Sequence, residues 1–217
     1  MTGSDDDPCA QALSASPGPW QAAAPSAPIG NDRHVAFLAL GSNLSWRGLR
    51  PAEILAAAQA QLRQCYPLIA ASSLYVSAAW PDPAEPAYLN AVLALRTADG
   101  PETVLKAAHA LEAAFGRTRR RRWAARSLDV DLVAQGCETR PSAQAWAQAA
   151  QGDQPPSGLI LPHPRAHLRT FVLAPLAQIA PAWRHPTLCQ NAADLLAALA
   201  PAQACEPIGW RQAMALH

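Results

Sequence analysis

The segment SLDVDLV, residues 127–133, alternates charged and apolar residues with the two-residue period of a β-strand. Because residues i and i+2 of a strand share a face, we expect Asp129 and Asp131 to project together while the apolar residues beside them enter a core. Two neighbouring carboxylates can bind Mg²⁺ and so clamp phosphate oxygens during an in-line displacement. A half-exposed edge strand with solvated aspartates fits the same pattern, so this segment alone leaves both interpretations open.

A dense group of arginines comes directly before this strand. Residues 117–126 contain six arginines within ten residues, although the whole chain has a formal net charge of only +1. Guanidinium groups bind phosphates bidentately, so an arginine-rich loop that leads into two aspartates is typical of a site for metal-bound polyphosphate. A solvated basic loop and an RNA-binding arm are the alternatives from charge alone. Neither a Walker A motif nor G-x-G-x-x-G occurs, which excludes the common glycine-rich phosphate cradles.

The rest of the chain supplies the partners of this strand. Apolar runs predict further strands at 34–40, 68–78 and 88–96, and helical spacing predicts helices at 51–65 and 101–115. With the strand at 128–134, the order is βαββαβ. This order predicts an α+β fold with a ferredoxin-like antiparallel sheet, both helices on one face and the opposite face open for a ligand. Extra C-terminal elements include a short helix at 191–199.

Composition sets the limits of this domain. Residues 1–33 are rich in Ala, Ser, Pro, Gly and Gln, which predicts a disordered tail. We expect residues 34–217 to form a single catalytic domain with an insertion at about 136–158 and a compact segment at 159–181. The five cysteines show no metal-ligand spacing and are expected to be reduced thiols. The N-terminus has no signal-peptide pattern and no window approaches a membrane span, so a cytoplasmic location is expected.

Several segments, in order, resemble one known family. They are AFLALGSNL at 36–44, SSLYVS at 72–77, YLNAVLALRT at 88–97, LEAAFGRTRRRRWAARSLDVDLV at 111–133 and LPHPRAHLRTFVLAPLAQIAP at 161–181. Together they resemble 6-hydroxymethyl-7,8-dihydropterin pyrophosphokinase over the range from about residue 34 to residue 181. The resemblance implies a transferase of folate biosynthesis that moves the β,γ-pyrophosphate of ATP to the pterin hydroxymethyl group, releases AMP and uses two Mg²⁺ ions.

The resemblance also implies roles for single residues. Asp129 and Asp131 would hold both Mg²⁺ ions, and Arg117 and Arg126 would join them in catalysis. The implied pterin-binding residues are Ser77, Ala78, Tyr88, Asn90, Trp123 and Phe171, where Asn90 reads the ring edge and Tyr88 and Phe171 stack on its faces. The implied ATP-binding residues are Glu112, Arg122, Arg126, His163 and Arg169. Without the resemblance, Asn90, Tyr88 and Phe171 would be interpreted as core residues.

The sequence departs from the family pattern at a few positions. Ala124-Ala125 replaces the usual Gly-Pro, and Ser77-Ala78 replaces the usual Thr-Pro. The segment 116–123 is one residue shorter, so residues 119–121 receive no individual role. A diverged relative with weak or altered activity is therefore the main alternative, and a ferredoxin-like RNA-binding module is the second, although exposed strand aromatics are missing. We expect a monomer that binds small molecules and neither nucleic acid nor membrane.

Overall fold

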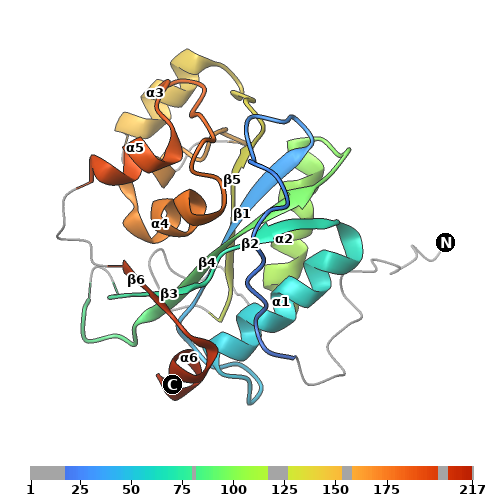
Figure 1. Ribbon diagram of the computed structural model, residues 1–217, viewed down its shortest axis with the longest axis vertical. Coiled ribbons are helices and arrows are strands. Elements are labelled where there is room, and N and C mark those ends of the chain that lie inside the picture. The colour runs from blue at the N-terminus through green and yellow to red at the C-terminus, as the bar shows by residue number, and fades with distance from the viewer. Residues whose placement is uncertain (1–17, 80–81, 117–126, 153–157, 200–204, 217) are drawn as a thin grey trace.

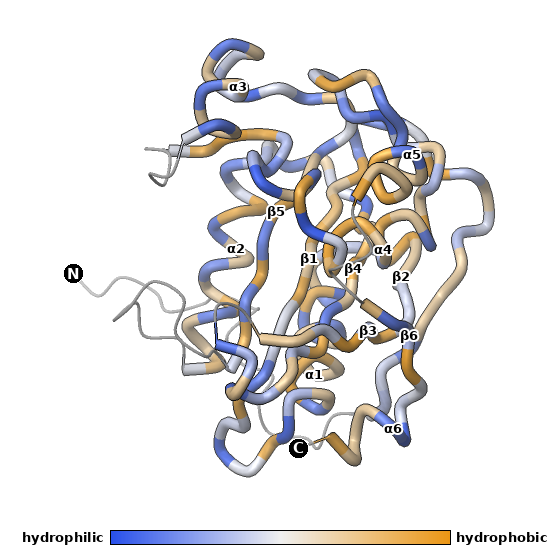
Figure 2. Tube along the Cα trace, turned by 90° about the vertical axis from the view of Figure 1, so that its left-hand side faces the viewer, coloured by the Kyte–Doolittle hydropathy of each residue, from blue (hydrophilic) through white to orange (hydrophobic). Residues whose placement is uncertain are grey.

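The computed structural model describes residues 18–79, 82–116, 127–152, 158–199 and 205–216. Its six strands form one antiparallel sheet in the order β5-β1-β4-β3-β6, with β2 also paired to β4. The strands are β1 (Val35–Ser42), β2 (Leu68–Ala71), β3 (Leu74–Ser77), β4 (Tyr88–Arg96), β5 (Asp129–Gln135) and β6 (Cys205–Ile208). β1 and β4 are apolar and buried on both faces, as expected for central strands covered on both sides (Figure 2).

Helices lie on both sides of the sheet (Figure 1). α1 (Pro51–Cys65), α2 (Pro101–Ala114) and α6 (Trp210–Ala215) share one hydrophobic core with the strands. α4 (Thr170–Ile179) and α5 (Ala192–Ala197) build a second core on the opposite face, around residues such as Phe37, Val92 and Trp183. α1 and α2 share a face as predicted, but the expectation of an uncovered opposite face is wrong for the area under α4 and α5. The periodicity of the sequence did not indicate on which face of the sheet the 159–181 segment would pack.

The strand predicted at 68–78 is broken into β2 and β3 at Ser72-Ser73. The Ser72 hydroxyl accepts a hydrogen bond from the backbone N–H of Val92 at 3.0 Å, in place of a strand carbonyl. The backbone N–H of Ser73 donates to the side chain of Gln178 on α4 at 2.9 Å. At Ser72-Ser73, hydrogen bonds with side chains thus replace backbone–backbone hydrogen bonds of the sheet, which interrupts the strand.

The N-terminal segment 18–33 is packed against the sheet, so the predicted disordered tail is wrong for these residues. The Trp20 side chain is buried, and its indole N–H donates to the carbonyl of Ser72 at 2.8 Å. Ala23 forms a β-bridge with Ala71 at the edge of β2, and Ile29 enters the second core. Two apolar anchors within a polar composition are enough to hold the segment. Residues 1–17 lie outside the described residues.

Trp20 is expected to contribute strongly to stability. Replacing it with alanine removes a buried indole and leaves the Ser72 carbonyl without its partner, so Trp20→Ala should lower the free energy of unfolding by about 3 kcal/mol. Urea denaturation measures this value. Ser26→Ala, at an exposed position in the same segment, is the control and should unfold like the wild type. Equal stability of the two variants would contradict the anchoring role.

The insertion at 136–158 contains a helix, α3 (Ala143–Gln151), which packs on a cluster of aromatic rings. Trp146 lies against His167 and His185, with ring centroids 5.4 and 4.7 Å away. The His185 ring also contacts Trp183, whose indole N–H donates to the carbonyl of Gly136 at 3.0 Å. At the other end of the chain, the helix predicted at 191–199 is α5, and it is followed by β6 and α6, which were not predicted.

His185 should make the stability of the protein depend on pH. Burial, with a smaller contribution from nearby His167, lowers the pKa of His185 to about 4. Between that value and its unfolded pKa of about 6.5, only the unfolded chain binds a proton here, so stability should fall as the pH falls from 6.5 to 4, by on the order of 2 kcal/mol. Urea denaturation at a series of pH values measures the slope.

The matched control for this pH dependence is His185→Asn. The Nδ1 atom of His185 accepts hydrogen bonds from the backbone N–H groups of Thr187 and Leu188 at 3.2 and 3.1 Å. An asparagine oxygen can accept from the same donors but does not titrate in this range. The variant should show a flatter pH dependence between 6.5 and 4. An unchanged slope would assign the effect to other groups.

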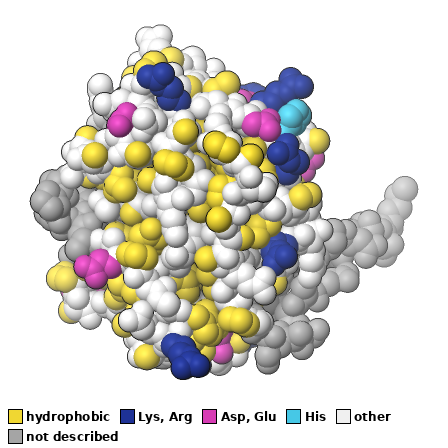
Figure 3. Space-filling model, viewed as in Figure 1, with side chains coloured by type: hydrophobic (Ala, Val, Ile, Leu, Met, Phe, Trp, Pro, Cys, Tyr) yellow, Lys and Arg dark blue, Asp and Glu magenta, His cyan; other side chains and the backbone are white. Residues whose placement is uncertain are grey.

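Neither the helices nor the charges seen on one face indicate a membrane span or a basic stripe among the described residues. None of the helices in the described ranges has the length and hydropathy that a bilayer crossing requires. On the face seen in Figure 3, charged side chains stand singly or in small groups, mostly toward the rim, among hydrophobic and uncharged ones. The described residues on that face therefore form no continuous basic stripe.

Candidate active site

Asp129 and Asp131 lie on the same face of β5, as the alternation of the segment predicts. Val130 and Leu132, on the other face, enter the core shared with α1 and α2. Asp131 pairs with Ala39 and Asp129 pairs with Gly41 in the register between β5 and β1. Both aspartates are partly exposed, and the Asp131 side chain is 38% exposed. Two partly exposed carboxylates therefore lie together on one side of the sheet.

Asn90 lies on the same sheet face, across Gly41 from Asp129. Gly41 of β1 pairs with Asn90 of β4 on one side and with Asp129 of β5 on the other. A Cβ atom added to Gly41 would lie 3.5 Å from Asn90 Oδ1 and 4.0 Å from Asp129 Cβ. The glycine thus leaves space between an amide and a carboxylate, where a larger residue would fill it.

Hydrogen bonds orient the amide of Asn90. Its Nδ2 atom donates to the hydroxyl of Ser77 at 3.0 Å and lies 3.5 Å from the carbonyl of Tyr88. Ser77 and Tyr88 face each other in the register between β3 and β4. The structure therefore brings three of the residues assigned to the pterin together on two neighbouring strands.

Two basic side chains from the 161–169 segment approach Asp131. Its Oδ2 atom lies 4.0 Å from Nε2 of His163 and 3.7 Å from Nη1 of Arg169. The Arg169 guanidinium also lies 5.6 Å from the ring centre of Phe171. Residues more than thirty positions apart in the sequence therefore meet at one carboxylate.

His163 is held as a neutral donor. Burial lowers its pKa, although the nearby Asp131 carboxylate acts in the opposite direction. The backbone N–H of Arg165 donates to Nδ1 of His163 at 3.3 Å, so the neutral ring carries its proton on Nε2, the atom that faces Asp131. This site therefore combines a permanent cation, Arg169, with a neutral N–H donor.

Glu112 takes a different position from the other residues assigned to ATP. It lies on α2 and is only 2% exposed. Its Oε1 atom accepts a hydrogen bond from the backbone N–H of Val130 at 2.8 Å, at the edge of β5. The side chain thus supports the strand that carries the two aspartates, and its contact with ATP stays a prediction.

The arginine-rich segment lies outside the described residues. This applies to Arg117, Arg122, Trp123 and Arg126, whose assigned roles therefore stay predictions. The residues that flank the segment are described: the hydroxyl of Ser127 donates to the carbonyl of Phe115, and the hydroxyl of Ser42 donates to the carbonyl of Ser127. The two ends of the segment are thus tied together beside the end of β1.

Sequence reasoning missed Trp46, which lies in the loop between β1 and α1. Its ring packs on Phe115 with centroids 5.7 Å apart, and the guanidinium of Arg47 lies 4.5 Å above it. Gly116 has a φ of +77°, and a Cβ atom there would lie only 2.1 Å from the indole nitrogen. Glycine is therefore required where the chain enters the arginine-rich segment. A tryptophan in a polar loop was the available signal.

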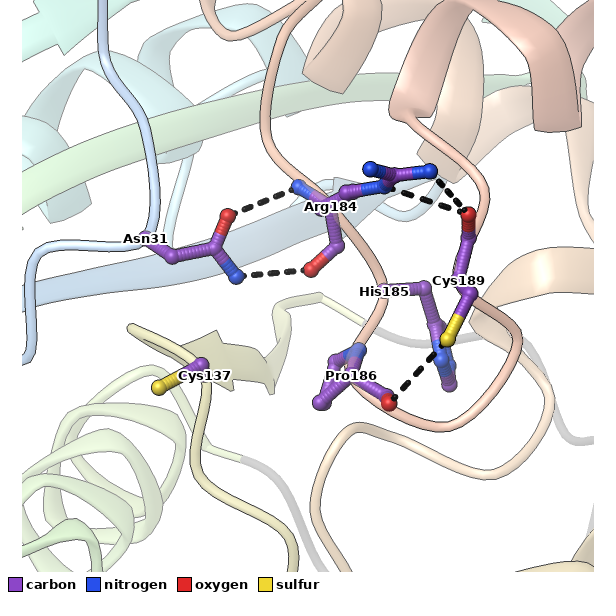
Figure 4. A pocket seen from close by; sticks show the side chains of 6 residues that line it. All are labelled: Asn31, Cys137, Arg184, His185, Pro186 and Cys189. Carbon is purple, nitrogen blue, oxygen red and sulfur yellow. Dashed lines mark hydrogen bonds between the residues drawn. The ribbon is translucent and has the colours of Figure 1, made fainter.

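An open depression is lined by other residues (Figure 4). It is lined by Asn31, Cys137, Arg184, His185, Pro186 and Cys189. The Arg184 guanidinium donates to the carbonyl of Cys189 at 2.9 and 3.2 Å, so the protein itself engages this cation. None of the residues assigned to the site from the sequence lines this depression.

Comparison with known proteins gives consistent matches. A family model described as 7,8-dihydro-6-hydroxymethylpterin-pyrophosphokinase (HPPK) matches residues 37–181. The 2-amino-4-hydroxy-6-hydroxymethyldihydropteridine pyrophosphokinase of Synechocystis is 34% identical over 158 residues, which cover 70% of each chain. The protein of the same name from Methylorubrum extorquens is 35% identical over 148 residues, 67% of this chain and 82% of the relative.

Solved structures agree at the level of fold. A crystal structure of HPPK-DHPS in complex with substrates matches with a TM-score of 0.55 at 13% identity over 76% of this chain. The wild-type HPPK-DHPS of Plasmodium falciparum matches with a TM-score of 0.52 at 14% identity over 75% of this chain. The matches cover 43% and 44% of those longer chains. At this identity the likeness concerns the fold alone.

Proposed function

Because this chain belongs to the 7,8-dihydro-6-hydroxymethylpterin-pyrophosphokinase family, we propose that it transfers the β,γ-pyrophosphate of ATP to the hydroxymethyl oxygen of 6-hydroxymethyl-7,8-dihydropterin. AMP is the second product. The observation that carries the proposal is the arrangement on one sheet face, where Asp129 and Asn90 flank Gly41. Next to them, His163 and Arg169 approach Asp131.

The carboxylates of Asp129 and Asp131 suit Mg²⁺. Among the described residues, no group of three or more His, Cys, Asp and Glu side chains is placed to hold a metal by itself. This agrees with Mg²⁺, which commonly takes one or two carboxylates and completes its shell with water and substrate phosphates. We propose two ions, which when bound would neutralise charge on the phosphates.

Asn90 and its neighbours would orient the pterin. An amide presents a donor and an acceptor side by side, which matches the edge of a pterin ring, and the Ser77 hydroxyl holds the amide in place. Tyr88 and Phe171 are proposed to stack on the ring. Because Gly41 places no side chain between Asn90 and Asp129, we propose that the hydroxymethyl oxygen approaches the two aspartates there. Fixing the nucleophile in this way lowers the entropic part of the barrier.

His163 and Arg169 would bind the phosphates. The guanidinium supplies a permanent charge, and the Nε2–H of His163 supplies a neutral hydrogen bond beside the same carboxylate. Arg117, Arg122 and Arg126 are proposed to add phosphate contacts, and Trp123 a pterin contact. Glu112 is proposed to bind ATP, and its hydrogen bond with the backbone of Val130 also supports β5.

The reaction balances without a covalent enzyme intermediate. A bond forms between the hydroxymethyl oxygen and the β-phosphorus, while the bond from the β-phosphorus to the bridging oxygen of AMP breaks. The hydroxyl proton passes from the attacking oxygen to solvent, and Asp131 is proposed to lie nearest to that oxygen. Catalysis would then consist of positioning and charge stabilisation, as is general for phosphoryl-type transfer.

Product analysis tests this function. The chain is incubated with ATP, Mg²⁺ and the hydroxymethyl-dihydropterin, and the products are identified by mass. We expect equal amounts of AMP and the dihydropterin diphosphate. ADP with a pterin monophosphate would identify a different transfer. Binding of both ligands without any product would favour the diverged relative that the departures at Ser77-Ala78 and Ala124-Ala125 suggest.

The setting of the enzyme is also proposed. The strand order β5-β1-β4-β3 supports a ferredoxin-like core within a single catalytic domain, which also includes the packed residues 18–33. We propose that it works as a monomer in the cytoplasm. The RNA-binding alternative predicts a salt-dependent shift of RNA without ATP binding. The arginine-rich segment that this alternative would use lies outside the described residues.

A further inference from the structure

The inserted helix α3 is bonded to the back of the segment that carries His163 and Arg169. Trp146 is 3% exposed, and its indole N–H donates to the carbonyl of Pro162, the residue before His163, at 2.8 Å. From the segment, Nη2 of Arg165 donates to the carbonyl of Gly152, the residue after α3, at 2.9 Å. The helix and the segment are therefore joined at two points on either side of His163.

The indole of Trp146 provides a third point of contact. Its ring lies 5.4 Å from the ring of His167, which belongs to a single 3-10 turn, Ala166–Leu168, directly before Arg169. On its other side the ring lies 4.7 Å from His185. Trp146 is thus wedged between the turn that leads into Arg169 and a turn of the 183–188 loop.

The front of the same segment is attached to β5. The backbone N–H of His163 donates to the carbonyl of Val133 at 2.7 Å, two residues beyond Asp131. The side chains of His163 and Arg169 then extend toward Asp131. The segment is therefore held between β5, which receives its functional side chains, and α3, which supports its backbone from behind.

We propose that Trp146 is a positioning residue, and that the inserted helix holds His163 and Arg169 in the geometry required to bind the ATP phosphates. This inference rests on the proposed function. Among the described residues, the hydrogen bond and the ring contacts of Trp146 involve none that is assigned to the pterin or the metal, so it would act through the 162–169 segment. Because a misplacement of about 1 Å can cost about a hundredfold in rate, a small movement of this segment should be measurable.

The proposal predicts a loss confined to ATP. In Trp146→Ala, the Pro162 carbonyl loses its buried donor and the His167 turn loses its packing partner. We expect the KM for ATP to rise, and kcat to fall, by about tenfold each, since the phosphate contacts become misaligned. The KM for the dihydropterin should stay within about twofold, because Asn90 and Ser77 lie on β4 and β3, and Phe171 is packed with α4 against the second core.

Two further variants keep the test decisive. Trp146→Phe keeps an aromatic ring but lacks the indole N–H, so an increase of about threefold in the ATP KM is expected. Gln148→Ala, at an exposed position on α3, is the matched control and should behave as the wild type. Circular dichroism confirms folding, and if Trp146→Ala does not fold, Trp146→Phe decides alone.

Binding measurements separate this proposal from the proposed function. Calorimetry with Mg²⁺ and α,β-methylene-ATP measures nucleotide affinity without turnover. If the wild-type protein releases no AMP, the proposed function is wrong. Weaker binding of α,β-methylene-ATP by the Trp146 variants would still support the positioning role. Folded Trp146 variants with wild-type ATP binding would overturn the inference, as would an equal loss of ATP and pterin binding.

Discussion

Replacing Asp131 with asparagine should lower kcat by about a thousandfold or more, while the free energy of unfolding changes by no more than about 1 kcal/mol. The substitution conserves shape but removes a charge from a partly exposed side chain. Without that charge the site loses half of its proposed metal-binding pair, and His163 and Arg169 lose the anion between them. AMP release is the measure of activity, and urea denaturation is the measure of stability.

Further variants test whether the two aspartates bind the metal. Asp129→Ala and Asp131→Ala should both abolish AMP release in a folded protein. Asp194→Asn, at an exposed position on α5, removes a carboxylate far along the chain from the site and should keep full activity. A doubly substituted Asp129→Ala/Asp131→Ala protein that still releases AMP would rule out the assignment of these carboxylates to the metal.

Asn90→Ala should raise the KM for the dihydropterin by about a hundredfold or more and leave the binding of α,β-methylene-ATP unchanged. Asn90 is almost fully buried, and its amide is oriented by the Ser77 hydroxyl. The substitution removes the donor and acceptor proposed to read the pterin edge, while His163, Arg169 and Asp131 stay in place. Steady-state kinetics and calorimetry measure the two ligands separately.

Ser77→Ala provides a graded comparison for this effect. It removes only the partner that orients the amide, so the pterin KM should rise by about tenfold or less. If the Asn90→Ala protein binds pterin as well as the wild type does, Asn90 has only a structural role, as a buried amide whose hydrogen bonds lie within the sheet. Equal losses of pterin and nucleotide binding would indicate a general disturbance of the sheet.

Local periodicity predicted the elements on which the site is built. The predicted ranges 51–65 and 88–96 coincide with α1 and β4, and the alternation in SLDVDLV placed the two aspartates on one face. These features follow from short-range geometry, since a strand alternates its side chains whatever surrounds it. The break at Ser72-Ser73 did not follow, because it depends on side-chain hydrogen bonds with β4 and α4.

Long-range packing explains what the sequence could not predict. The approach of His163 and Arg169 to Asp131 depends on how the 162–169 segment docks on β5, and no local pattern encodes that docking. Those residues were assigned through the family resemblance instead. Trp20 and Trp146 lie in segments whose average composition is polar or alanine-rich, so composition did not indicate that each segment contains a buried indole.

The proposed function depends above all on metal binding by Asp129 and Asp131. This binding is tested by titrating Mn²⁺ into the protein with saturating α,β-methylene-ATP while free Mn²⁺ is followed by electron paramagnetic resonance. We expect two bound ions per wild-type chain, and for Asp129→Asn/Asp131→Asn no more than the nucleotide binds alone. The same number of ions bound to both proteins would contradict metal binding by the two aspartates.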